Sequence, residues 1–125
     1  MATLELTAQN FEDNTDRDGI TVVDFWASWC GPCRQFAPIY ERVSEENPDI
    51  VFGKVDTQAN PDLAATFNVS AIPTLMVIRD RVVLYAQAGA LPKAAFEDLL
   101  QQARDLDMEK VRREAGIEGE AGVEG

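Results

Sequence analysis

Hydrophobic residues recur along the chain with two different spacings, and these spacings predict strands and helices in alternation. The nearly continuous apolar run at 20–27 predicts a strand that is covered on both faces. The stripe that follows, at i, i+3, i+4 and i+7, is typical of an amphipathic helix over 32–47. The same reasoning predicts strands at 3–7, 50–55, 74–78 and 82–88, short helices at 8–14 and from 60, and a last helix from 92.

The order of these elements indicates an α/β fold. Helical crossovers join the first strands, so we expect those strands to run parallel. The strands at 74–78 and 82–88 are separated by a tight turn and should form an antiparallel hairpin. Pro38 lies inside the helix at 32–47 and is expected to kink it, because proline removes a backbone hydrogen bond.

The helical pattern weakens after residue 104. Val111 extends the apolar stripe to about Ala115, and a glycine-rich acidic segment that cannot build a core follows. We therefore predict a folded domain at 1–104 and an extension at 105–125, in which the helix continues briefly before a disordered tail. Removal of residues 106–125 is expected to leave melting and activity nearly unchanged.

Composition and charge exclude several classes of function. The chain has 125 residues and a net charge of −11, so contacts with nucleic acid or with anionic membrane surfaces are disfavoured. No apolar run approaches the ~18 residues of a membrane span. The first residues contain no basic segment followed by an apolar one, so we expect no signal peptide and a cytosolic protein.

The only two cysteines, Cys30 and Cys33, lie where the predicted strand turns into the helix. Residues i and i+3 share one face in the first turn of a helix, within disulfide range. Pro32 suits this turn, and Gly31 leaves the backbone open. Because Cys30 lies at the positive end of the helix dipole, we expect it to be the exposed nucleophile, with Cys33 more covered and resolving.

Other interpretations of the cysteine pair fit less well. A zinc or iron–sulfur site usually needs four ligands, and the chain has two cysteines and no histidine, so we expect no metal. Haem attachment would need histidine at position 34, which is Arg34. A purely structural disulfide remains the alternative, although so short a loop removes little entropy from the unfolded chain.

Asp24 is unusual because it lies in the strand that should be buried on both faces. A buried carboxylate costs several kcal/mol unless it is paired or protonated. One possibility is an acid at a strand end that reaches solvent. The other is a buried carboxyl with a raised pKa, which takes the proton from Cys33 through a water molecule.

The run Asp24-Phe25-Trp26-Ala27-Ser28-Trp29-Cys30-Gly31-Pro32-Cys33 resembles the active-site signature of the thioredoxin family. Later landmarks of the family are Lys54, Ile72-Pro73-Thr74 and Gly89, and the resemblance covers about 3–104. It implies the thioredoxin fold, a central mixed five-stranded β-sheet flanked by four α-helices. It also implies that the cysteines lie at the carboxyl end of a central strand, where such sheets place their sites.

The resemblance assigns roles to residues around the cysteines. It implies that Asp24 is the proton acceptor, that Lys54 lies near it and modulates its titration, and that the Ile72–Pro73 bond is cis. Trp26 is expected to pack rather than react. The loop would offer the Ile72 backbone to an extended substrate, within a shallow apolar rim. The implied substrate-binding residues are Trp29, Gly31, Pro32, Ala71, Ile72, Pro73, Ala88, Gly89 and Ala90.

The implied activity is reduction of protein disulfides by a monomer, through a mixed disulfide at Cys30 that Cys33 resolves. No cofactor would bind the chain itself; a flavin-dependent thioredoxin reductase would recharge it with electrons from NADPH. A disulfide oxidase or isomerase on this fold and a non-catalytic binding scaffold are the alternatives. Two departures are Arg34, where lysine is commoner, and Arg81, where family members usually carry glycine. A positive φ at Arg81 would be tolerated poorly unless Asp80 adopts it instead.

Overall fold

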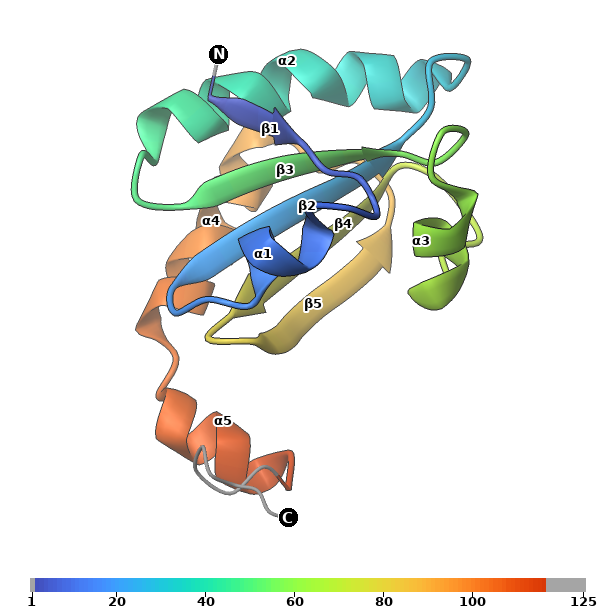
Figure 1. The fold of residues 1–125 in the computed structure, drawn as a ribbon. Coiled ribbons are helices and arrows are strands. Elements are labelled where there is room, and N and C mark those ends of the chain that lie inside the picture. Colours follow the sequence, from blue (N-terminus) through green and yellow to red (C-terminus); the bar gives the residue numbers. More distant parts are fainter. Residues whose placement is uncertain (1, 117–125) are drawn as a thin grey trace.

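The computed structural model describes residues 2–116, which contain five strands and five helices (Figure 1). Every predicted strand and helix is present, with boundaries displaced by a few residues. The elements are β1 Thr3–Glu5, α1 Phe11–Thr15, β2 Ile20–Trp26, α2 Gly31–Glu46, β3 Val51–Asp56, α3 Pro61–Thr66, β4 Thr74–Arg79, β5 Val82–Ala88, α4 Lys93–Asp105 and α5 Met108–Glu114.

The strands form one mixed sheet in the order β1-β3-β2-β4-β5. β3 pairs in parallel with β1 and β2, whereas β4 pairs antiparallel with β2 and β5. The predicted five-stranded sheet is therefore confirmed. β2 is its central strand, so the chain leaves the middle of the sheet when it reaches the two cysteines (Figure 1).

Helices cover both faces of the sheet, which explains the continuous apolar run of β2. Ile20 and Val22 belong to a cluster with residues of α2 and α4, whereas Val23 and Phe25 belong to a second cluster beside α1 and α3. Figure 1 shows α1 in front of the sheet and α4 behind it. Successive residues of a strand point to opposite faces, so a strand in the middle layer must be apolar at nearly every position.

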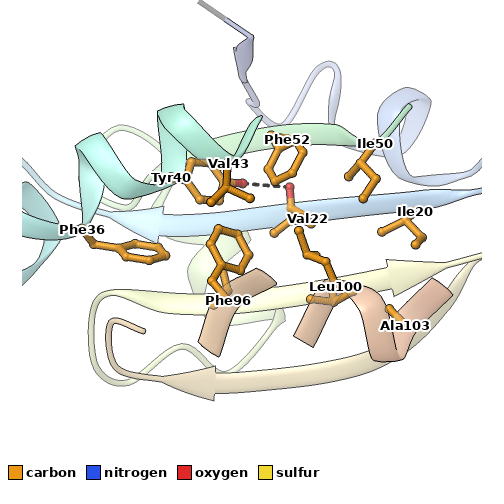
Figure 2. Close-up of a cluster of buried hydrophobic side chains, with 12 residues drawn as sticks. Ile20, Val22, Phe36, Tyr40, Val43, Ile50, Phe52, Phe96, Leu100 and Ala103 are labelled. Atoms are coloured by element: carbon orange, nitrogen blue, oxygen red, sulfur yellow. Dashed lines mark hydrogen bonds between the residues drawn. The ribbon is translucent and has the colours of Figure 1, made fainter. Parts of the chain in front are cut away.

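Tyr40 joins α2 to the two strands that carry the candidate charged residues. Its hydroxyl donates to the carbonyl oxygen of Gly53 at 2.6 Å. It also donates to the carbonyl oxygen of Val22 at 3.1 Å, and its ring stacks on Phe96 of α4 (Figure 2). The side chain is fully buried. Burial of a phenol is tolerated because its polar end has partners, so one side chain anchors α2, β2 and β3 together.

In the hairpin turn between β4 and β5, Arg81 has the positive φ that we expected it to tolerate poorly. Asp80 has φ 51° and Arg81 has φ 73°, so both residues, not Asp80 alone, take the left-handed conformation of a two-residue hairpin turn. Arg81 compensates by pairing with Asp16 and Asp18, each at 2.7 Å, and Asp80 accepts a hydrogen bond from the backbone N–H of Gly19. These contacts fasten the hairpin to the loop before β2, far along that strand from the cysteines.

We predicted that the last helix continues past residue 105, but α4 ends at Asp105. The Arg79 side chain donates to the carbonyl oxygens of Ala103, Arg104 and Leu106 at 2.8–3.0 Å and so satisfies the end of the helix. A new helix, α5, then begins after Asp107, whose carboxylate accepts from the N–H groups of Glu109 and Lys110. Helical structure thus reaches about Ala115 as expected, but as a separate helix, because Arg79 of β4 satisfies the end of α4.

Helix α5 docks on the domain, which alters our expectation about the extension. Met108 is only 7% exposed, and the Arg112 guanidinium lies 3.7 Å from the Asp80 carboxylate. Because α5 makes these contacts, we now expect that deletion from residue 106 lowers stability. The predicted disordered tail lies at 117–125, outside the described residues. None of the helices within 2–116 is long and apolar enough to cross a membrane.

A Met108→Ala variant should lower the free energy of unfolding by about 2 kcal/mol, because it removes a buried side chain at the contact that holds α5. Alanine is the better helix former, so the loss cannot come from helix propensity. Denaturant unfolding of this variant, beside Val111→Ala at a half-buried position of the same helix, measures the effect. Unchanged stability in both variants would mean that α5 does not contribute to the fold.

Candidate active site

The two cysteines form a disulfide at the start of α2. Cys30 is the N-cap residue, Gly31 and Pro32 follow in the first turn, and the Cα atoms of Cys30 and Cys33 are 5.2 Å apart. The Cys30 sulfur accepts a hydrogen bond from the backbone N–H of Cys33 at 3.2 Å. The predicted helix start and disulfide geometry are therefore confirmed. A negative charge on Cys30 would be stabilised by this N–H and by the helix dipole.

The exposure of the two cysteines differs from our expectation. Cys30 was predicted to be the more exposed residue, but each is 3% exposed. The loop before β4 covers Cys30: Ile72 packs against the cysteine cluster, and its carbonyl oxygen lies 3.7 Å from the Cys30 sulfur. Exposure therefore does not show which sulfur is the nucleophile in the oxidised chain. Position favours Cys30, because it is the N-cap residue of α2.

The loop that precedes β4 lies beside the disulfide, and a backbone hydrogen bond joins it to the segment that follows β5. The Ile72–Pro73 bond is cis, and the Pro73 carbonyl accepts a hydrogen bond from the Gly89 N–H at 2.8 Å. Gly89 has φ 113°, a conformation that strains any other residue. Of the predicted substrate-binding residues, Trp29 is 63% exposed. Pro73 is buried, Gly31 and Ile72 are half-buried, and Pro32, Ala71, Ala88, Gly89 and Ala90 are exposed.

Asp24 is buried within the sheet, so the alternative of an acid that reaches solvent is wrong. It is 1% exposed, and its Oδ1 atom has no hydrogen-bond partner among the described residues. Burial raises the pKa of Asp24 from 3.8 to about 7, although the Lys54 ammonium acts in the opposite direction. The carboxyl group can therefore change its protonation state near neutral pH.

Lys54 is brought to Asp24 by strand register. The two residues are direct neighbours across the parallel β2–β3 pair. The Lys54 ammonium also lies 4.9 Å from the ring centroid of Trp26, two residues further along β2. Since residues i and i+2 of a strand share a face, the acid, the lysine and the indole lie together on one side of the sheet.

Trp26 connects this charged pair to the cysteines. We predicted that it packs, and it does pack against the cluster of Ala27, Cys30 and Cys33. Its contact with the Lys54 ammonium was not anticipated, although the alternation of Asp24 and Trp26 along β2 could have suggested it. The sequence analysis also did not predict that the Tyr40 hydroxyl ties α2 to β2 and β3. Its place in the apolar stripe indicated burial but not these hydrogen bonds.

Within the part of the chain that the structure describes, no group of three or more His, Cys, Asp or Glu side chains is arranged to hold a metal ion. The described site contains a disulfide and a buried carboxyl group.

Comparison with known proteins identifies this arrangement. A family model described as thioredoxin matches residues 2–102. The chain belongs to the thioredoxin family. A Streptomyces coelicolor protein named "Putative thioredoxin 2" is 54% identical over 112 residues, which are 90% of this chain and 84% of that protein. The thioredoxin of Bacillus subtilis is 37% identical over 103 residues, which are 82% of this chain and 98% of that protein.

A solved structure agrees with the sequence relatives. A mutant thioredoxin from Halobacterium salinarum superposes with a TM-score of 0.77 and 28% identity, covering 83% of this chain and 92% of that one. The thioredoxin fold is thus confirmed, with α1–α4 as its flanking helices and α5 beyond the residues that the family model matches. The chain is a thiol–disulfide oxidoreductase of this family, with Cys30–Cys33 as its redox-active disulfide.

Proposed function

We propose that the chain reduces disulfides in other proteins. The observation that supports this most directly is the position of the Cys30 sulfur, at the N-terminus of α2 and within 3.7 Å of the Ile72 carbonyl oxygen. A thiolate there is stabilised, and the neighbouring backbone can guide an extended substrate toward it.

The first step is attack by the reduced site. The Cys30 thiolate attacks one sulfur of the substrate disulfide, which forms a mixed disulfide and releases the other substrate sulfur as a thiolate. That thiolate then takes a proton. Ile72 positions the substrate backbone, and the exposed Trp29 ring covers the apolar side chains next to the substrate disulfide. The remaining proposed contacts are Gly31, Pro32, Ala71, Pro73, Ala88, Gly89 and Ala90.

The second step releases the reduced substrate. The Cys33 thiol gives its proton through a water molecule to the Asp24 carboxylate, and the Cys33 thiolate attacks the Cys30 sulfur. The bond between Cys30 and the substrate breaks, the second substrate sulfur leaves as a thiolate that then takes a proton, and the Cys30–Cys33 disulfide forms. Two electrons pass from the chain to the substrate. Asp24 suits this role because its pKa of about 7 lets it both accept and return a proton near neutral pH. Lys54 favours the carboxylate form.

The oxidised chain must regain two electrons for another cycle. We propose that a thioredoxin reductase supplies them from NADPH through its flavin, while no cofactor is bound by this chain. We also propose that it acts as a cytosolic monomer, in which 1–104 form the redox domain and 105–125 an extension attached through α5. Family membership supports the reductase and the cytosolic location, and the match of the family model to residues 2–102 supports the boundary of the redox domain.

The reduction potential separates reduction from the oxidase or isomerase alternative. After equilibration of the full chain in glutathione buffers, the Cys30–Cys33 pair should be more reducing than glutathione. Thiol labelling and mass spectrometry give the reduced fraction at each buffer ratio. A more oxidising potential would contradict the proposed direction of electron flow and would favour a donor of disulfides.

A further inference from the structure

Arg34 places a cation next to the redox disulfide, at the start of α2. It follows Cys33 in the first turn of α2, and its side chain is exposed. Its guanidinium nevertheless folds back, because Nη1 donates to the carbonyl oxygen of Ser28 at 2.8 Å. A methyl group built on Gly31 would lie 4.0 Å from Nη2. The charge therefore lies over the segment that contains Trp29 and Cys30.

This guanidinium is available for a ligand. No carboxylate of residues 2–116 lies within 4.0 Å of it, whereas Arg79, Arg81, Arg104 and Arg112 have acidic partners. Arg17, Arg42 and Arg113 also form no ion pair within these residues, but none of them lies in the first turn of α2. A guanidinium has five N–H donors, and the Ser28 carbonyl accepts from one nitrogen. Its planar remaining edge matches the geometry of a carboxylate.

Helix stability does not account for this cation. Positive charge in the first turn of a helix is unfavourable, because it adds to the positive end of the dipole. The proposed substrate-binding residues around the disulfide are all uncharged. Arg34 thus provides a charge at the edge of an apolar surface, within a chain of net charge −11 that repels acidic proteins in general.

We propose that Arg34 determines substrate specificity by binding an Asp or Glu carboxylate of the substrate protein, located a few residues from the disulfide that is reduced. The proposal rests on the disulfide reduction proposed above and names the class of substrate that this site prefers. Acidic residues elsewhere on the substrate are repelled by the net charge, so the position of the acid decides the preference.

Paired disulfide peptides test the proposal. The two peptides are identical except for Glu or Gln beside the target cysteine, and kcat/KM for reduction is measured with the full chain. The wild-type chain should prefer the Glu peptide by up to about fivefold, the upper end of what an exposed ion pair contributes. Arg34→Gln should abolish the preference, Arg34→Lys should keep part of it, and Arg34→Glu should reverse it. Added salt should weaken it.

Arg42→Gln is the matched control, because it removes the same charge from an exposed position two turns further along α2. It should retain the wild-type preference. Loss of the preference in both Arg34→Gln and Arg42→Gln would indicate a general charge effect and overturn the proposal, as would an unchanged preference in Arg34→Gln. Failure of the wild-type chain to reduce either peptide would instead refute the proposed reductase activity.

Discussion

A Cys30→Ser variant is expected to reduce protein disulfides no faster than the uncatalysed reaction. A serine hydroxyl is not ionised near neutral pH, and it cannot exchange with a disulfide. Serine is itself a favourable N-cap residue, so α2 should still begin correctly and the variant should fold. Turnover is measured as thiol release from a disulfide-bonded protein, with dithiothreitol as the source of electrons.

The Cys33→Ser variant is the control that separates the two sulfurs. It keeps the proposed nucleophile and lacks the resolving thiol, so it should accumulate a stable one-to-one mixed disulfide with the substrate, detectable by mass spectrometry. Residual turnover in Cys30→Ser would contradict the assignment of the nucleophile. A failure of Cys33→Ser to trap any substrate would favour the non-catalytic scaffold.

An Asp24→Asn variant of the oxidised chain should be more stable than the wild type at pH 8, by up to about 4 kcal/mol, and nearly unchanged at pH 4. The carboxyl group has a pKa of about 7 in the folded chain and 3.8 as its ordinary value. Between these values the folded state keeps a proton that the unfolded state releases, so wild-type stability falls as pH rises from about 4 to about 7. Each pH unit costs about 1.4 kcal/mol, and the penalty is constant above pH 7.

Denaturant unfolding at the two pH values measures this difference. Glu45→Gln, at an exposed position of α2, is the matched control and should change stability little at either pH. The amide group that replaces the carboxyl group would also be buried with one polar atom that has no hydrogen-bond partner, and this costs free energy. The gain of about 4 kcal/mol in the free energy of unfolding is therefore an upper bound. An equal effect of Asp24→Asn at pH 4 and pH 8 would show that Asp24 does not titrate between them.

The same variant addresses the proposed proton transfer. Because the Asp24 pKa is about 7, its replacement should slow reduction most near neutral pH and change the shape of the pH–rate profile. If the pH–rate profile of Asp24→Asn matches that of the wild type, Asp24 does not take part in proton transfer, even if the stability effect is found.

The sequence alone determined the local structure of the site. The apolar run of β2, the amphipathic stripe of α2 and the cysteine spacing predicted a disulfide at a strand-to-helix junction, and that junction is present. The sequence also identified Asp24 as an acid within a buried strand. These predictions succeed because they depend on neighbours in the chain, where a hydrophobic period of two or 3.6 residues reflects which face is buried.

Tertiary structure decided the contacts between distant segments. The register of β2 and β3 places Lys54 beside Asp24. The loop at Ile72 covers Cys30, so that Cys30 and Cys33 are equally buried. Arg79 ends α4, and α5 then packs against the domain. Family resemblance suggested the first of these contacts, but the residues themselves did not. Strand register and the burial of a sulfur are set by packing among segments tens of residues apart, and local patterns do not encode which of those segments meet.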